Sequence, residues 1–241
     1  MENIKIDSSN IAIIIPTYNA HAGIVETVLA IKKHVAGATV FVVDDNSPDG
    51  TANIVRSKFK NDKRIRLILR ANKQGRGSAV IAGFKESLRL KNFLYFIEMD
   101  SDMCHNPKYI LDLVTVCSKA DIAIASRYLP SSKIYGWSFE RKIMSYSINH
   151  LAKILLRIPI SDYTDGYRCY SRKVVNFICK SQIKSHGYIV LSEVAYICYK
   201  ENFKFAEIPI SFHFKPVSKS NLNFNEIKEA LVVLLKLRTS Q

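Results

Sequence analysis

The chain is short of acidic residues, glycine and proline, and each shortage narrows what it can be. Its 241 residues hold 21 Asp and Glu against 35 Lys and Arg, which gives a formal net charge of +14. Such an excess favours anionic partners, namely nucleic acid, an acidic lipid surface or phosphorylated substrates, although a basic solvated surface explains it equally well. With nine Gly, seven Pro and no low-complexity tract, the composition is that of a globular protein.

The chain also lacks paired cysteines and long apolar runs. Its five cysteines are scattered, without a Cys-x-x-Cys pair, at Cys104, Cys117, Cys169, Cys179 and Cys198. This pattern argues against a zinc ribbon or a disulfide scaffold and is typical of a reducing compartment. No apolar run reaches the roughly 18 to 20 residues of a spanning helix, and the first residues show no signal-peptide apolar region. We therefore expect a cytoplasmic protein that is at most peripheral at a membrane.

Short apolar runs alternate with helical periods over the first half of the chain. We expect strands at 11–15, 39–43, 64–69, 93–99 and 121–125, helices at 23–34, 51–59, 77–90, 107–118, 138–156 and 187–199, a strand at 205–212, a polar loop at 214–223 and a last amphipathic helix. Continuous apolar strands separated by helices predict an α/β fold with a mostly parallel central sheet and helices on both faces.

Two acidic clusters stand where predicted strands end. Asp100 and Asp102 follow one strand, and residues 42–51, which read VVDDNSPDGT, end another. Because the carboxyl ends of neighbouring parallel strands converge on one crevice, these carboxylates are expected to share a ligand site. Hard carboxylate oxygens suit Mg²⁺ or Mn²⁺, which in turn suits a diphosphate. The pattern predicts a nucleoside diphosphate site.

Further motifs follow in a fixed order. They are PTYN at 16–19, VVDDNSPDGT at 42–51, MDSDMCHNP at 99–107, ASRY at 125–128, Trp137 with Arg141 and Ser145, DYTDGYRCY at 162–170, Gly187 with Glu193, and EIPISF at 207–212. Over residues 11–222 this series resembles the polyprenyl (dolichol) phosphate mannose synthase branch of glycosyltransferase family 2, whose members have the Rossmann-like GT-A fold.

The resemblance implies one activity and one division of the chain. It implies transfer of mannose from GDP-mannose to a polyprenyl or dolichyl phosphate with inversion, as in a dolichyl-phosphate β-D-mannosyltransferase. It implies a single domain over 1–241, with a nucleotide-sugar-binding half at about 8–125, an acceptor-binding half at 126–222 and a C-terminal helix at 223–241. It also places the protein on the cytosolic face of a membrane, the endoplasmic reticulum in a eukaryote or the plasma membrane in a prokaryote.

The resemblance also assigns roles to single residues. Asp100 and Asp102 are implied to hold the divalent metal and the diphosphate, and Arg127 and Arg141 the acceptor phosphate. Asp45 is implied to contact the GDP moiety. The remaining implied donor contacts are Pro16, Tyr18, Val43, Ser101, Arg127, Lys215 and Asn221, and Cys104 stands at a possible third metal position.

Several positions are open to a structural role instead. Tyr18 can stack on a base or belong to a strand-end turn, and Asp44 can fix the turn beside Asp45. Residues 49–51 are better explained as a turn with a helix N-cap. The loop at 75–77 opens a helix, where a phosphate can bind, but a helix-start turn explains it better. Arg168 is expected to pair with Asp165 or Glu193.

Three departures from the family pattern bear on the site. A thiol at Cys104 is a poor Mg²⁺ ligand where some relatives have an oxygen ligand. Ala20 replaces an acidic residue that often follows PTYN. In SKSNL at 218–222, Asn221 replaces a lysine, for which Lys219 is a nearby substitute.

Other readings remain open from the sequence. UDP-glucose is an alternative donor, and a saccharide acceptor is possible but would need a general base, for which no His/Asp dyad stands out. The basic and apolar residues at 138–156 suit either a membrane surface or the core, and a small membrane-spanning subunit is a possible partner. An inactive nucleotide- or membrane-binding adaptor is the remote alternative. Nucleic acid is not expected, because the aromatic and basic interleaving of RNA-binding motifs is absent.

Overall fold

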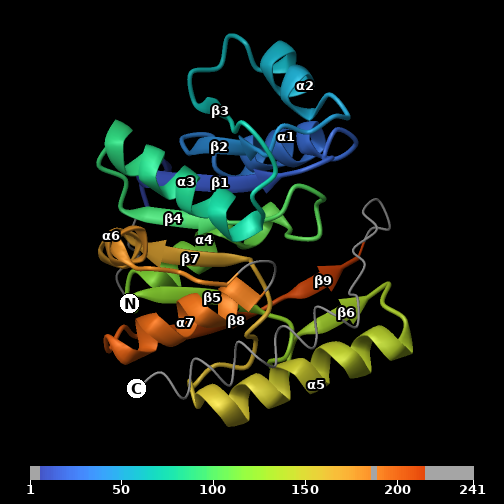
Figure 1. The fold of residues 1–241 in the computed structure, drawn as a ribbon, viewed down its shortest axis with the longest axis vertical. Helices are drawn as coiled ribbons and strands as arrows, with labels where there is room; N and C mark the ends of the chain where they lie inside the picture. The colour runs from blue at the N-terminus through green and yellow to red at the C-terminus, as the bar shows by residue number, and fades with distance from the viewer. Residues whose placement is uncertain (1–5, 186–188, 215–241) are drawn as a thin grey trace.

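The computed structural model describes residues 6–185 and 189–214. Its centre is a seven-stranded sheet in the order β3-β2-β1-β4-β7-β5-β8 (Figure 1). The strands are β1 (Ile11–Thr17), β2 (Thr39–Asp44), β3 (Ile65–Leu69), β4 (Tyr95–Glu98), β5 (Ile122–Ser126), β7 (Arg168–Ser171) and β8 (Phe205–Pro209). All neighbours run parallel except β7, which is antiparallel to both β4 and β5. The predicted α/β fold with a mostly parallel sheet is confirmed.

Helices cover both faces of this sheet. They are α1 (Ile24–His34), α2 (Thr51–Lys58), α3 (Arg76–Leu90), α4 (Ile110–Cys117), α5 (Phe139–Leu156), α6 (Arg172–Lys180) and α7 (Val190–Lys200), with 3₁₀ turns at Ser8–Asn10 and Pro107–Tyr109. Helices α3, α6 and α7 pack on one face, and α1 and α4 on the other (Figure 1). A separate two-stranded parallel sheet joins β6 (Lys133–Tyr135) to β9 (Ser211–His213).

Strand β1 divides the core into two clusters because its side chains alternate between the faces. Ile11, Ile13 and Ile15 join the cluster of α1 and α4, whereas Ala12 and Ile14 join the cluster of α3. All five side chains are fully buried. Burying one isoleucine contributes about 1.5–3 kcal/mol, so this strand is a main source of the stability that holds its carboxyl end in place.

Strand β1 runs past the proline at which it was expected to stop. Pro16 pairs with Val43 of β2, and the strand ends at Thr17. The amide of Met99 donates to Ile14 O, which shows that Ile14 and Pro16 turn their backbone groups toward β4. The paired part of β4 reaches only Ile14. The missing N–H of Pro16 therefore removes no ladder hydrogen bond, and the proline is tolerated.

The second half holds the elements that the sequence did not predict. Strands β6 and β7 and helix α6 were not expected, and the single strand predicted at 205–212 is two strands, β8 and β9, separated at Ile210. The predicted loop from 215 and the last helix lie outside the described residues, as does Gly187 in the helix predicted at 187–199. Within the described part of the chain, no helix is both long and apolar enough to cross a bilayer.

Candidate active site

The loop after β4 carries Asp100 and Asp102 and packs tightly on the start of α1. Thr27 Oγ1 donates to the carbonyl of Ser101 at 2.9 Å. A Cβ at Gly23 would lie 2.7 Å from that carbonyl oxygen, so only glycine allows the approach. Within the loop, the amide of Cys104 donates to Asp102 Oδ1 at 3.0 Å. The two aspartates are thus held at the carboxyl end of β4, where the sequence placed them.

Asp100 is paired with an arginine that the sequence analysis treated as part of a helix-start turn. Arg76 donates to Asp100 Oδ1 from Nε at 3.2 Å and from Nη2 at 3.0 Å, and its Nη1 pairs with Glu98. Burial opposes a charge on Asp100, but Arg76 and His105 outweigh it and hold the pKa of this carboxyl below its usual range. In the sequence, the one sign that Arg76 belongs to the site was its position as a basic residue between two glycines at a helix start.

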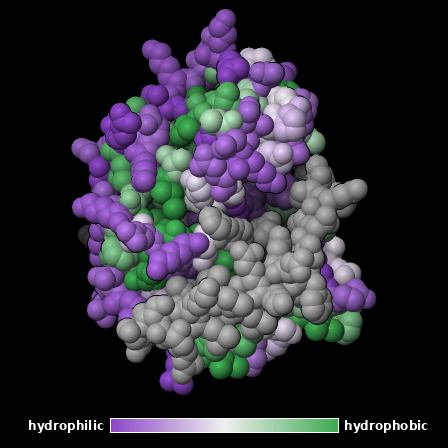
Figure 2. Space-filling model, in the orientation of Figure 1, coloured by the Kyte–Doolittle hydropathy of each residue, from purple (hydrophilic) through white to green (hydrophobic). Residues whose placement is uncertain are grey.

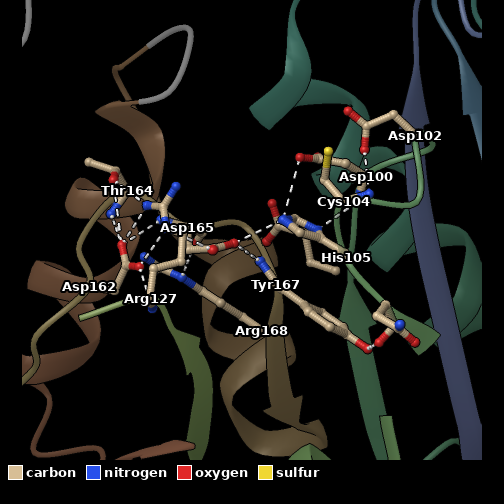
Figure 3. A network of polar contacts seen from close by, with 12 residues as sticks. Asp100, Asp102, Cys104, His105, Arg127, Asp162, Thr164, Asp165, Tyr167 and Arg168 are labelled. Carbon is tan, nitrogen blue, oxygen red and sulfur yellow. Dashed lines mark hydrogen bonds and ion pairs between the residues drawn. The ribbon is translucent and has the colours of Figure 1, made fainter. Parts of the chain in front are cut away.

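His105 connects Asp100 with Asp165 (Figure 3). Its Nδ1 accepts a hydrogen bond from the backbone N–H of Asp100 at 2.9 Å, and its Nε2 lies 2.9 Å from Asp165 Oδ1. The ring stacks on Tyr167, with centroids 4.9 Å apart. Burial disfavours the imidazolium, yet the two carboxylates outweigh it and raise the pKa of His105 to about 9. The N–H directed at Nδ1 opposes that protonation, because it occupies the lone pair that the proton needs.

Arg127, at the end of β5, is the cation of a buried ion-pair network. Asp162 accepts from its Nε at 2.7 Å and its Nη2 at 2.8 Å, a bidentate pair, and Thr164 Oγ1 accepts from Nη2 at 2.8 Å. Asp165 Oδ2 lies 3.0 Å from Nε. Burial opposes a charge on Asp165, but Arg127 and His105 hold the pKa of this carboxyl well below its usual range. Through His105 the network runs from Arg127 to Asp100 (Figure 3).

The two arginines assigned to the acceptor lie around one aromatic ring. The guanidinium carbons of Arg127 and Arg141 are 5.3 Å and 4.9 Å from the centroid of Trp137. Because Asp162 takes Nε and Nη2 of Arg127, a phosphate contact from this residue would have to come from Nη1. The structure thus brings the predicted pair together, but the fork of Arg127 is directed at a protein carboxylate. The acceptor role stays a prediction.

Asp45 and Asp44, at the end of β2, are both tied to nearby loops. Asp45 pairs with Arg70 at 2.5 Å and accepts from the amides of Gln74 and Gly75, both at 3.0 Å. Asp44 accepts from the hydroxyl of Thr17 and from the amide and hydroxyl of Ser47. The turn-fixing role of Asp44 is confirmed. A nucleoside would meet Asp45 as part of a preformed contact with the 70–75 loop.

The other residues predicted to contact the sugar nucleotide differ in how far they are exposed to solvent. Tyr18 is half-exposed, with Lys73 Nζ 4.1 Å from its ring centroid, so a face of the ring is within reach of a base. Val43 is fully buried in the core, and only its backbone could meet a nucleotide. Asp49 accepts from the amide and hydroxyl of Thr51, which confirms the structural role of residues 49–51. Lys215, Lys219 and Asn221 lie outside the described residues.

Arg168 does not form the ion pair with Asp165 or Glu193 that was expected of it. Its guanidinium is fully buried and donates to three backbone carbonyls, those of Asp165, Leu191 and Tyr163, at 2.8–2.9 Å. The carboxylate of Glu193 instead accepts from the amides of Lys184 and Ser185. Arg168 therefore stabilises the loop before β7 through main-chain oxygens rather than through a carboxylate.

The two aspartates fit a metal ion whose remaining coordination positions are filled by substrate. Asp100 and Asp102 supply hard oxygens, and the Asp100 side chain is 36% exposed. In the described residues, no three His, Cys, Asp or Glu side chains converge as a metal held by protein alone would need. Mg²⁺ typically takes one or two carboxylates and fills its remaining positions with phosphate oxygens and water. The metal role of Cys104, which is buried, stays a prediction.

The mostly parallel seven-stranded sheet with helices on both faces is the fold of the GT-A glycosyltransferases. The sequence profile of Glycosyl transferase family 2 matches residues 12–178. The chain belongs to this family and is a glycosyltransferase.

Two curated relatives and one solved structure are similar to this chain. It is 33% identical to polyprenol monophosphomannose synthase of Mycolicibacterium smegmatis, over 91% of this chain and 83% of that protein. It is 31% identical to undecaprenyl-phosphate mannosyltransferase of Micrococcus luteus, over 91% and 90%. Glucosyl-3-phosphoglycerate synthase of Mycobacterium tuberculosis, solved with Mn²⁺, UDP and its product, superposes with a TM-score of 0.67 at 17% identity, over 97% of this chain and 82% of that one. The last likeness shows the fold alone.

Proposed function

We propose that this transferase moves mannose from GDP-mannose to a polyprenyl or dolichyl phosphate, with inversion at the anomeric carbon. The observation that carries the proposal is the likeness to two enzymes named for polyprenyl phosphate mannose transfer, each over 91% of this chain. The motifs quoted for the resemblance extend over both halves of the chain, including the segment at 162–170. The same segment supplies Asp162 and Asp165 to the network around the site.

On the donor side, Asp100 and Asp102 would hold Mg²⁺ or Mn²⁺. When bound, such an ion stabilises the negative charge of the departing diphosphate. Asp45 and Tyr18 lie at the carboxyl ends of β2 and β1, where the nucleoside of a GT-A donor would bind. This arrangement supports a nucleoside diphosphate sugar without distinguishing guanosine from uridine.

On the acceptor side, the residues at the site suit a phosphate monoester better than a hydroxyl group. Its oxygen is already anionic at neutral pH, so it attacks without a general base. His105 is buried between Asp100 and Asp165, with both ring nitrogens engaged, and is badly placed to act as one. Arg127 and Arg141 supply positive charge beside Trp137 for binding the phosphate. A hydroxyl acceptor would need a general base, a role for which His105 is poorly placed.

We further propose that α5 rests on the membrane that holds the lipid acceptor. Four large apolar side chains on this helix are exposed, and their spacing of four, three and eight residues places them on one face: Phe139, Ile143, Tyr146 and Ile154. Lys142, Lys153 and Arg157 are exposed nearby. An exposed apolar stripe with flanking cations suits an anionic bilayer surface. Figure 2 shows hydrophobic surface along its lower edge, where α5 lies in Figure 1. This supports a peripheral location at a membrane. We propose the cytosolic face, with the chain acting alone or with a small membrane-spanning subunit.

A transfer assay tests the proposed reaction. The purified chain is incubated with labelled GDP-mannose or UDP-glucose and a polyprenyl phosphate in detergent, with Mn²⁺, Mg²⁺ or EDTA. We expect metal-dependent label in the lipid phase from GDP-mannose, reduced at least 100-fold in Asp102→Ala, because the ion and the diphosphate lose a ligand.

The alternatives give different results in the same assay. Label from UDP-glucose alone would keep the mechanism and replace the donor. A folded protein that binds GDP but labels no lipid with either donor would contradict a lipid phosphate acceptor. Asp112→Ala, a change in the first turn of α4, is the matched control and should leave transfer unchanged.

A further inference from the structure

We propose that Arg76 is a built-in competitor of the divalent metal for Asp100, so that the metal binds well only together with a nucleoside diphosphate. The proposal concerns the order of binding at the donor site and rests on the proposed function for the identity of the nucleotide. It assigns a positioning role to a residue that neither the family resemblance nor the strand-end pattern singled out.

The first support is that Arg76 occupies a position built for it. The residue begins α3, and its side chain crosses Gly166 to reach the end of β4. A Cβ at Gly166 would lie only 2.0 Å from Arg76 Nη2, so the glycine leaves room for the guanidinium in its present position. The side chain is 15% exposed. A side chain so enclosed has few other orientations, and its contact with Asp100 is therefore part of the fold.

The second support is that Glu98 holds Arg76 independently of Asp100. Glu98 pairs with Nη1 of Arg76, while Nε and Nη2 face Asp100. Glu98 is buried and also accepts from the hydroxyl of Tyr170 at 3.1 Å. When Asp100 turns to another cation, Arg76 would remain beside the site with two of its donors released. A guanidinium stays charged at any physiological pH.

Electrostatics then links the metal to the nucleotide. A divalent ion that takes Asp100 Oδ1 must displace Arg76 from that oxygen, and an ion on either oxygen of Asp100 lies next to a permanent positive charge, which weakens binding of the ion alone. A bound diphosphate reduces both the competition with Arg76 and the repulsion by its charge. Its negative charge offsets the two cations, and its oxygens accept from the released Nε and Nη2, which suit a bidentate contact. Metal and nucleotide therefore each raise the affinity for the other by the same factor.

Direct binding measurements test this without the transfer reaction. Mn²⁺ binding is followed by electron paramagnetic resonance with and without GDP, in the wild type and in Arg76→Gln/Glu98→Gln. The double substitution keeps the net charge and leaves no buried Glu98 without a partner, so its fold is safer than that of Arg76→Gln alone. We expect Mn²⁺ alone to bind the double variant at least tenfold more tightly than the wild type, and the enhancement by GDP to shrink by a similar factor.

Two controls separate this role from a structural one. Arg76→Lys keeps the charge and should leave Mn²⁺ binding within about threefold of the wild type. Arg89→Gln, an exposed position near the end of the same helix, should change nothing.

Unchanged Mn²⁺ affinity in the double variant, or an undiminished GDP enhancement, would overturn the proposal. A failed mannose transfer with an intact link between Mn²⁺ and GDP would overturn the proposed function and leave the role of Arg76 standing.

Discussion

Arg127 and Asp162 join the end of β5 to the loop before β7 through one bidentate contact. The two partners are not equally dependent on each other. Asp162 also accepts from the amides of Arg127, Thr164 and Asp165, whereas the remaining carboxylate at the guanidinium is that of Asp165. The carboxylate therefore keeps three backbone donors if the arginine is lost, while the arginine loses its main partner if Asp162 is lost.

This asymmetry predicts a difference in stability. Asp162→Ala should lower the free energy of unfolding by about 3–5 kcal/mol, because it leaves a buried guanidinium poorly paired. Arg127→Met should cost about half as much. Thr164→Val should cost about 1–3 kcal/mol, because it removes the hydroxyl that accepts from Arg127 and Asn149 and donates to Asp162. Urea unfolding followed by circular dichroism measures all three. A larger loss for Arg127→Met than for Asp162→Ala would show that the backbone amides contribute little to holding Asp162.

At the scale of elements, α3 lies close to the sheet because of a glycine. A Cβ at Gly83 would lie 2.7 Å from Ile14 Cγ2 and 3.0 Å from Val43 Cγ2, both of which belong to the buried core. The close approach also fixes where α3 begins, and hence where Arg76 lies relative to the end of β4. The position of one small residue in the middle of the helix thus contributes to the geometry of the site.

Gly83→Ala should therefore destabilise the protein. Alanine favours the helix by about 1 kcal/mol relative to glycine, but an extra methyl group in a packed core costs about 1–3 kcal/mol. We expect a net loss of stability in urea unfolding, and a weaker link between Mn²⁺ and GDP if α3 shifts. Lys85→Ala on the exposed side of the same helix is the control and should stay within about 0.5 kcal/mol. If Gly83→Ala were more stable than the wild type, the core side chains around residue 83 would have to shift to accommodate the added methyl group.

The elements also show what the sequence could predict. Strands β1, β2 and β5 are buried on both faces and read as continuous apolar runs, so they were found. Strand β7 was missed because its four residues begin with Arg168, whose charge is met by carbonyls that only the folded chain brings together. Asp100 and Asp102 follow from the rule for strand ends. The partners of Arg76 and Arg127 do not, because they lie 22 to 38 residues away in sequence.

At the scale of the whole molecule, the net charge of +14 and the exposed stripe of α5 would both favour the proposed anionic membrane surface. Long-range attraction brings a basic protein to an anionic surface, and it weakens as salt screens the charges. The apolar stripe then adds a contact that salt does not screen. The two contributions can be separated in one experiment.

We expect the protein to sediment with vesicles that contain anionic lipid and to bind neutral vesicles poorly, with the bound fraction falling as salt rises. Phe139→Ser/Ile143→Ser should reduce binding several-fold at low salt, because it removes apolar contact area. Leu29→Ser, at a comparably exposed apolar position on α1, is the matched control. An equal loss in Leu29→Ser, or no preference for anionic lipid, would contradict α5 as the contact surface.

The placement of β7 also bears on how such a chain can be divided or recombined. Cys169 of β7 pairs with Ile97 of β4 on one side and with Ala123 of β5 on the other, so a strand from late in the sequence closes a gap between two earlier ones. A fragment ending at residue 126 would have two open strand edges facing each other across that gap. A segment exchanged between relatives from residue 126 onward would replace β7, the strand that pairs with β4 beside Asp100 and Asp102. A change to the segment that contains β7 therefore also changes the pairing of β4, whose end carries Asp100 and Asp102.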